Sequence, residues 1–84
     1  MELRAVGSAP RLKKSKFRAP GTTRFIDIHK RLRKHLKLGP AEPLYVYISQ
    51  AFRPRPDDLV AELHEAFNVG GTLIINYSIL EAWG

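Results

Sequence analysis

Hydrophobic residues follow two different periods along this chain of 84 residues, and each period predicts one kind of element. The run at residues 44–48, LYVYI, is rich in β-branched and aromatic side chains and predicts a strand. A second apolar run at residues 72–77, TLIINY, predicts a buried strand, and short alternation at residues 1–6 predicts another. Residues 11–17, RLKKSKF, alternate loosely and predict a fourth strand, basic on its exposed face, that forms a hairpin with the first.

Two other segments have apolar residues at helical spacing. In the first, steps of three, four and four separate the apolar residues Phe25, Ile28, Leu32 and Leu36. This spacing predicts a long amphipathic helix that is capped by Thr22 or Thr23 and runs to about Leu38. Asp57 or Asp58 can cap a second, shorter helix. Its inward-facing residues are expected to be Leu59, Val60, Leu63 and Phe67.

The predicted order is strand, strand, long helix, strand, short helix, strand, in a single domain over residues 1–84. A hairpin followed by a crossover helix gives a mixed sheet, and we expect the last strand beside the first in its middle. The fold class is therefore α+β: a ubiquitin-like β-grasp with a four-stranded mixed sheet, a long helix and a shorter second helix. Periodicity alone leaves a ferredoxin-like fold or a split α+β sandwich open.

Composition narrows the class of protein. Hydrophobic content of 44% and charged content of 26% are those of an ordinary globular chain. The absence of cysteine excludes disulfides, thiolate metal sites and a cysteine nucleophile, and it fits a reducing compartment. No apolar stretch approaches the ~20 residues that span a bilayer, and no signal-peptide pattern opens the chain. We therefore expect a soluble, intracellular protein.

A net charge of +6 and a pI of about 10.1 favour association with anionic partners. Cations gather around the predicted second strand and its aromatic residue Phe17: Arg11, Lys13, Lys14, Lys16 and Arg18. Tyr45 and Tyr47 share one face of their strand, which leaves a base-stacking RNA surface open. The alternative is that the lysines solvate one face and the tyrosines pack under the helix. Neither a K/R-G-F/Y signature nor a GXXG clamp is present.

Residue patterns typical of catalysis or metal binding are missing. The three histidines, His29, His35 and His64, do not have the spacing of a zinc or iron site. The acidic pairs fit helix capping and a solvated helix face, and no serine lies in a nucleophile elbow. We therefore predict a protein that is not an enzyme and has no metal or cofactor. Phe52, in a proline-rich loop, is either a core plug or an anchor for a partner.

The end of the sequence, Trp83-Gly84, follows the last apolar run through a short spacer. Glycine has no Cβ, so its carbonyl can enter a narrow channel and be attacked from either side. A protein whose own C-terminus is activated and joined to another molecule needs this property. The alternative is that Gly84 is simply the last residue of the gene.

Taken together, the segments resemble the autophagy-related protein 12 family of ubiquitin-like modifiers. The first part of the resemblance is LRAVG at residues 3–7, with Pro10, Lys13, Lys16 and Phe17. The most specific part is LYVYI followed by Gln50, Phe52, Pro54, Pro56 and Asp57, and the pattern ends with Phe67, Gly71, Leu73, Ile75, Tyr77 and the AWG terminus. The sequence departs from the family at Ser49, where asparagine is common, and in residues 22–38, which match only in pattern.

The resemblance implies a modifier that is activated at its C-terminal glycine and conjugated through an isopeptide bond to a lysine of autophagy-related protein 5. The conjugate would act as a ligase-like factor that promotes lipidation of the sister modifier, autophagy-related protein 8, during autophagosome formation. Partners would be the autophagy-specific activating and conjugating enzymes and the sister modifier's conjugating enzyme. The resemblance further implies a cytoplasmic protein, recruited to the preautophagosomal isolation membrane only indirectly, as part of the conjugate.

The resemblance also assigns roles to residues. Gly84 would supply the carbonyl, with Trp83 and Ala82 anchoring the tail. Lys16 and Phe17, with Lys13, would recruit the conjugating enzyme by pairing cations and an apolar contact with an acidic peptide. The loop candidates for a further partner contact are Gln50, Phe52 and Pro54. The other function left open is a non-conjugated basic ubiquitin-like module that binds RNA or a partner protein.

Overall fold

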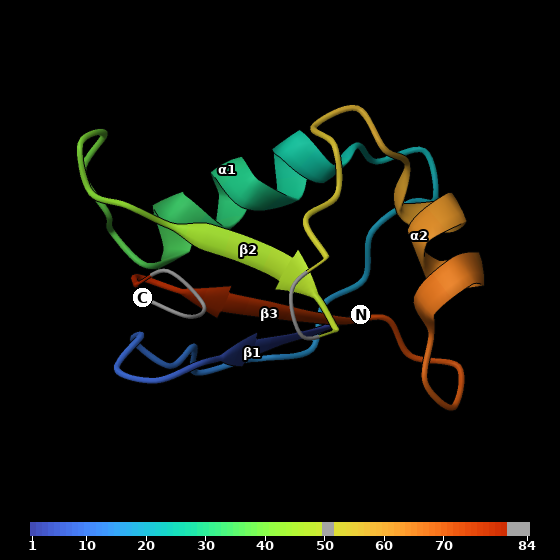
Figure 1. The fold of residues 1–84 in the computed structure, drawn as a ribbon, viewed down its shortest axis with the longest axis horizontal. Helices are drawn as coiled ribbons and strands as arrows, with labels where there is room; N and C mark the ends of the chain where they lie inside the picture. Colours follow the sequence, from blue (N-terminus) through green and yellow to red (C-terminus); the bar gives the residue numbers. More distant parts are fainter. Residues whose placement is uncertain (50–51, 81–84) are drawn as a thin grey trace.

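The computed structural model describes residues 1–49 and 52–80. Within these ranges it has three strands and two helices, which Figure 1 shows in chain order. The elements are β1 (Glu2–Ala5), α1 (Phe25–His35), β2 (Tyr45–Ile48), α2 (Val60–Phe67) and β3 (Ile74–Ser78). Neither helix in this part of the chain is long and apolar enough to cross a membrane.

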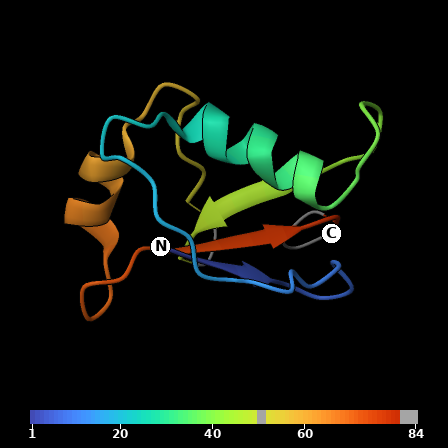
Figure 2. The same ribbon diagram turned by 180° about the vertical axis from the view of Figure 1, so that it is seen from behind.

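β3 is the central strand of a sheet with the order β1-β3-β2. It pairs in parallel with β1, where Leu3 lies opposite Ile75, and antiparallel with β2, where Val46 lies opposite Tyr77. The expected position of the last strand, beside the first in the middle of the sheet, is confirmed. Helix α1 lies across one face of this sheet, and α2 lies beyond one end of it (Figures 1 and 2).

The core lies between α1 and the sheet and is centred on β3. Leu73, Ile75 and Tyr77 are each 0% exposed, at alternating positions that all face inward. The helical stripe predicted from the sequence supplies the opposite side, with Phe25, Ile28 and Leu32 buried. The two hydrophobic periods of the sequence therefore meet in one cluster.

The predicted fourth strand at residues 11–17 is wrong for the described structure, whose sheet has three strands. This segment does run beside β1, but it makes a single isolated antiparallel bridge, between Glu2 and Lys16. Two backbone hydrogen bonds hold it there: Leu3 N donates to Ser15 O at 2.8 Å, and Phe17 N donates to Met1 O at 2.9 Å.

The reason for this interruption lies in the spacing of two apolar residues. Leu12 and Phe17 are five positions apart, so a regular strand would point them to opposite faces. Both nevertheless pack against the core. The chain bends at Lys13, between them, and the bend breaks the ladder. Burial of both side chains therefore outweighs continued strand pairing.

The predicted side-chain caps of both helices are also wrong. The residues that precede the helices are Arg24 and Leu59, and neither makes a side-chain capping bond. Instead, N–H groups in the first turn of each helix donate to the segment before the other helix: Phe25 to Asp58, Ile26 to Pro56, Val60 to Thr23, and Ala61 to Gly21. This reciprocal arrangement satisfies backbone donors that a helix start otherwise leaves unpaired.

Helix α1 ends earlier than predicted, at His35 rather than near Leu38. Lys37 has a φ of 57°, in the left-handed region, which turns the chain out of the helix. The Arg33 guanidinium then donates to the carbonyl oxygens of Gly39 and Glu42, at 2.8 and 2.6 Å. These bonds fix the loop between α1 and β2.

Candidate functional site

The predicted reactive end of the chain follows β3, but Gly84, Trp83 and Ala82 lie outside the described residues. The described chain leaves the sheet after Ser78, whose hydroxyl accepts a hydrogen bond from Leu80 N at 3.0 Å. Ser78 is buried and lies opposite Tyr45 of β2, whereas Leu80 is 60% exposed. The path toward the C-terminus therefore starts from a paired, buried position at the edge of the core.

Tyr77 anchors the strand that carries this path. Its hydroxyl donates to the carbonyl oxygen of Pro10 at 2.7 Å, and its side chain is fully buried. Burial raises the pKa of the Tyr77 phenol above its ordinary value of 10.0, and the Leu12 backbone and then the positive charge of Arg11 oppose part of this increase. β3 is thus held by two neighbouring strands and by the loop that follows β1.

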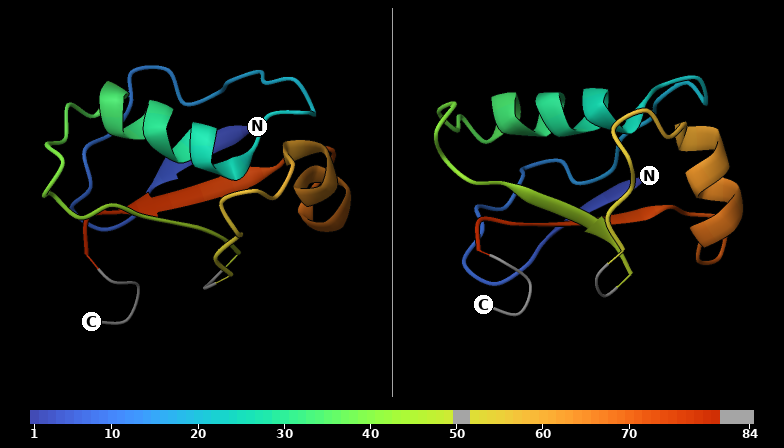
Figure 3. Two further views of the ribbon diagram at one scale, coloured as in Figure 1. Left: turned by 90° about the horizontal axis from the view of Figure 1, so that it is seen from above. Right: turned by 45° about the horizontal axis from the view of Figure 1, so that its top comes forward.

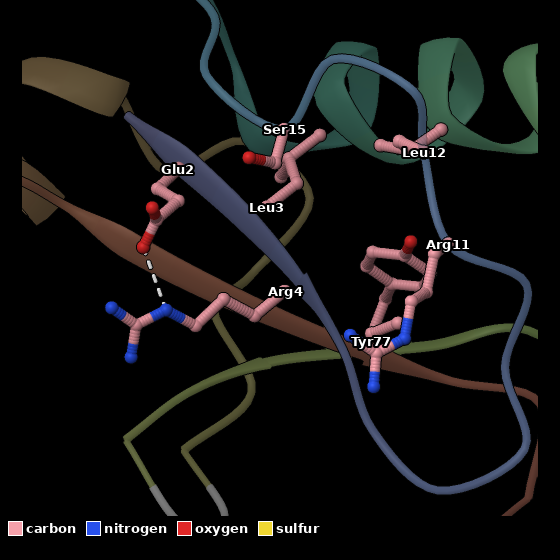
Figure 4. Close-up of a pocket in the computed structure, with 8 residues that line it drawn as sticks. Glu2, Leu3, Arg4, Arg11, Leu12, Ser15 and Tyr77 are labelled. Atoms are coloured by element: carbon pink, nitrogen blue, oxygen red, sulfur yellow. Dashed lines mark hydrogen bonds and ion pairs between the residues drawn. The ribbon is translucent and has the colours of Figure 1, made fainter.

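A hollow of about 330 Å³ lies beside Tyr77, between β1 and the segment that returns along it. Figure 4 shows Arg11 next to the Tyr77 ring, and Arg4 turned toward Glu2 at the other end of the hollow. The Arg4 Nε atom lies 2.6 Å from the Glu2 carboxylate. Ser15 also lines the hollow, but its hydroxyl has no hydrogen bond to a base among the described residues, and the Glu2 carboxylate is paired with Arg4. The lining residues therefore form no nucleophile–base pair.

The three residues predicted to recruit the conjugating enzyme are only partly brought together. Lys16 and Phe17 border one hollow of about 640 Å³, together with Lys14 and Arg18. Lys13 is exposed but is not among the residues that line it. The cations around Phe17 are all exposed, so the hollow combines positive charge with part of an aromatic ring.

Phe17 has a structural role as well as an accessible edge. Its side chain is half-buried and packs against the core. Its ring lies against the His35 ring of α1, with centroids 5.9 Å apart and planes at 50°. His35 is exposed, and nothing in the sequence predicted its contact with Phe17 directly. The helical register of α1 gave the only signal, because it placed His35 on the flank of the buried stripe.

Phe52 and Pro54 have different environments, although they are two residues apart. Phe52 is 43% exposed, and its ring stacks on Phe67 of α2 with centroids 4.7 Å apart. Its backbone exchanges two hydrogen bonds with Ile48, at 2.7 and 3.0 Å. Pro54 is buried and helps line a largely apolar groove of about 260 Å³ between α1 and β2. The third loop candidate, Gln50, lies outside the described residues.

The histidines of the described chain contact backbone oxygens or an aromatic ring. His29 Nε2 lies 3.2 Å from Leu44 O, and His64 Nε2 lies 2.9 Å from Gly71 O. Within residues 1–49 and 52–80, no group of three His, Cys, Asp or Glu side chains is placed to hold a metal ion.

The family described as "Ubiquitin-like autophagy protein Apg12" matches the chain over residues 1–84. The ubiquitin-like protein ATG12 of Medicago truncatula is 44% identical over 84 residues, which cover 100% of this chain and 85% of that protein. The ATG12 of Oryza sativa subsp. indica is 36% identical over 84 residues, covering 100% and 87%. The ATG12 of Mus musculus is 37% identical over 82 residues, covering 98% of this chain and 58% of the mouse protein.

Two solved structures have the same fold. One is Plasmodium falciparum Atg8 in complex with a P. falciparum Atg3 peptide, with a TM-score of 0.80 at 19% identity, covering 94% of this chain and 73% of that chain. The other is Trypanosoma brucei ATG8, with a TM-score of 0.82 at 22% identity, covering 92% and 68%. These neighbours confirm the ubiquitin-like α+β class and decide against the ferredoxin-like alternative.

Proposed function

Because the chain belongs to the Apg12 family of ubiquitin-like autophagy proteins, we propose that it is a modifier activated at Gly84 and conjugated to a lysine of autophagy-related protein 5. The observation that carries this proposal is the family match, which extends from residue 1 through Gly84. The chain shares 44% of its residues with the ATG12 of Medicago truncatula across its whole length.

The conjugation would proceed in three transfers of the glycyl group. The Gly84 carboxylate first attacks the α-phosphate of ATP, which releases pyrophosphate and leaves a glycyl adenylate. A cysteine thiolate of the activating enzyme displaces AMP, and a cysteine of the conjugating enzyme then takes the glycyl group by thioester exchange. A lysine amine finally attacks the thioester carbonyl, which releases the thiolate and forms the isopeptide. Apart from the Gly84 carboxylate in the first step, each nucleophile belongs to another protein, so this chain acts as a substrate and not as an enzyme.

The anchoring of β3 supports this role. Tyr77 and Ser78 are buried, and β3 is paired on both sides, so the strand preceding the tail is rigid. A ubiquitin-like core of this kind lets enzymes hold the folded body while its C-terminal segment enters their active sites. The missing Cβ of Gly84 would leave its carbonyl open to attack.

The exposed surface around Phe17 is the proposed place of contact for the sister modifier's conjugating enzyme. Lys16 is exposed and Phe17 is half-buried at one hollow, which suits an acidic peptide with an apolar side chain. The P. falciparum neighbour was solved with an Atg3 peptide, so a protein of this fold binds a peptide in that case. Lys13, further along the segment, would add long-range attraction.

In this account the conjugate acts as a ligase-like factor for lipidation of autophagy-related protein 8. The protein would be cytoplasmic and would reach the preautophagosomal membrane as part of the conjugate. Of the two described loop candidates, Phe52 would contact a partner, because its side chain is exposed, whereas Pro54 is buried.

Reconstitution with the activating and conjugating enzymes, ATP and the acceptor protein tests the proposal. Deletion of Gly84 or Gly84→Ala should abolish or strongly slow formation of the covalent adduct without changing the thermal unfolding of the domain. Gly39→Ala is the matched control, since a Cβ there meets only the Glu42 carboxylate at an ordinary 3.5 Å. An adduct that forms equally well without Gly84 refutes conjugation through this residue.

A further inference from the structure

Charged residues are segregated in this molecule. Of the acidic residues in the described chain, four lie in or just before α2: Asp57, Asp58, Glu62 and Glu65. The outward side of α1 is instead basic, where Lys30, Arg31 and Lys34 are exposed and border one shallow hollow with His35. Asp27, in the first turn, is the one acidic residue of this helix.

A second group of cations adjoins this helix. Lys14, Lys16 and Arg18 are exposed around the hollow at Phe17. The contact between the Phe17 and His35 rings, with centroids 5.9 Å apart, joins this hollow to the flank of α1. The segment that carries these cations passes along the side of α1 that faces away from β2 (Figure 3, left). We call the combined surface the basic face: Lys14, Lys16, Arg18, Lys30, Arg31 and Lys34.

Within the described residues no ion pair uses the basic face, although Lys34, in the last turn of α1, suits the helix dipole. The one ion pair among the described residues joins Arg4 to Glu2, outside this surface. Arg33, on the same helix, is different, because its guanidinium donates to two backbone carbonyls. Lys30 and Lys34 are one helical turn apart, and like charges at that spacing destabilise a helix. A cluster of neighbouring cations that forms no ion pair with another described residue points to an external anion.

The composition of the α1 part of the basic face favours a lipid surface over a protein. Protein interfaces depend on apolar and aromatic anchors and are depleted in lysine. The apolar residues of α1 are turned into the core, so its outward side offers no such anchor. Anionic headgroups attract several lysines and arginines at once without a fixed geometry, and the long side chains of these residues can reach toward them.

We propose that the basic face binds the anionic surface of a bilayer, with phosphatidylserine-type headgroups as the ligand. The bilayer then meets the molecule on the side of α1 that faces away from β2, along which the segment with Lys16 also runs (Figure 3, left). Binding is peripheral, because the surface is polar and nothing on it inserts into hydrocarbon. This contact needs no conjugation, and its test varies Lys30 and Lys34, which the function proposed above does not use.

Cosedimentation with vesicles tests the inference. The whole chain is mixed, at physiological salt, with vesicles of phosphatidylcholine alone or of phosphatidylcholine with phosphatidylserine. Binding should require phosphatidylserine and weaken as salt shortens the Debye length. Lys30→Glu/Lys34→Glu should lower the apparent affinity by roughly 25-fold or more, since each cation at such a surface contributes about fivefold. Lys30→Gln/Lys34→Gln should also lower the apparent affinity for the vesicles, while perturbing the helix less.

The matched control is Arg11→Glu/Arg55→Glu, which changes the net charge by the same amount at two exposed positions outside the basic face. It should keep most of the affinity, and circular dichroism should show all variants folded. Equal losses in both variants would mean that only net charge matters, and would overturn the assignment. Absence of binding to phosphatidylserine vesicles would overturn it as well. So would tighter binding to single-stranded RNA or to polyglutamate than to the vesicles at the same salt.

Discussion

The Tyr77 hydroxyl and the Pro10 carbonyl, 67 positions apart in the sequence, are joined by a 2.7 Å hydrogen bond. The bond ties the central strand β3 to the loop that follows β1. It also gives a buried phenol the partner that such a group requires. The strand that leads to the C-terminal segment is therefore fixed from the side as well as along its edges.

Tyr77→Phe should destabilise the domain by about 1 kcal/mol, because it removes this bond and leaves the Pro10 carbonyl unpaired while keeping the ring. Denaturant unfolding measures the loss. Tyr45→Phe provides a comparison on the neighbouring strand, since Tyr45 is only half-buried and is expected to change stability less.

Tyr77→Phe should also reduce the loss of unfolding free energy that occurs at alkaline pH. Burial raises the folded-state pKa of Tyr77 above the ordinary 10.0, so folding favours the protonated phenol. The stabilisation is complete below about pH 10 and is lost as the pH rises through the folded-state pKa. Unfolding free energy measured from pH 8 to 12 should fall less steeply in Tyr77→Phe than in the parent protein. Parallel curves would contradict the assignment.

The reciprocal capping of the two helices makes Gly21 sensitive to substitution. A Cβ at this position would lie 2.9 Å from the Ala61 Cβ atom, too close for two carbon atoms. Gly21→Ala should therefore cost about 1–3 kcal/mol of unfolding free energy, as overpacking does. Gly39→Ala, where the nearest atom is 3.5 Å away, should be close to neutral. Equal stability of the two variants would show that the helix starts are not held against each other.

The stacked pair of Phe52 and Phe67 should couple energetically. Its ring centroids are 4.7 Å apart, and such pairs contribute about 0.5–1.5 kcal/mol beyond simple burial. A double-mutant cycle with Phe52→Leu and Phe67→Leu measures this coupling in the isolated domain. Strict additivity would leave the exposed Phe52 ring without a structural function and favour its role as an anchor for a partner.

Substitutions at Lys16 and Phe17 should separate recruitment from folding. Lys16→Glu should leave the unfolding free energy within about 0.5 kcal/mol, because the side chain is exposed, yet weaken binding of the conjugating enzyme. Phe17→Ala should cost less than the about 3–5 kcal/mol typical of a fully buried ring. Isothermal titration calorimetry with the sister modifier's conjugating enzyme measures the affinity of each variant, and Arg55→Glu is the charge-matched control. Unchanged binding by Lys16→Glu would exclude this surface.

Three of the four predicted strands and both helices follow from hydrophobic period, because burial of alternate or helically spaced residues decides these elements. The failures have a different origin. Residues 11–17 form no strand since the odd spacing of Leu12 and Phe17 conflicts with alternation, and the core takes both side chains. The predicted helix caps are wrong because the N–H groups at the helix starts bind backbone carbonyls 30 or more residues away in the chain, such as Asp58 O for Phe25 N.

The candidate surfaces, too, could be predicted from the sequence only in part. Sequence position alone put Lys16 beside Phe17, and composition alone showed an excess of positive charge. Neither could reveal that His35 meets the Phe17 ring or that Phe67 stacks on Phe52, because both contacts depend on tertiary packing. Those contacts join two separate groups of cations in one case and hold a loop aromatic against α2 in the other.

The most direct test of the modifier function is mass spectrometry of branched peptides from the protein isolated from its native cells. Conjugation through Gly84 predicts a peptide in which the Gly84 carbonyl is linked to the Nζ atom of a lysine in autophagy-related protein 5. Recovery of the protein only with a free Gly84 carboxylate, from cells undergoing autophagy, would contradict it.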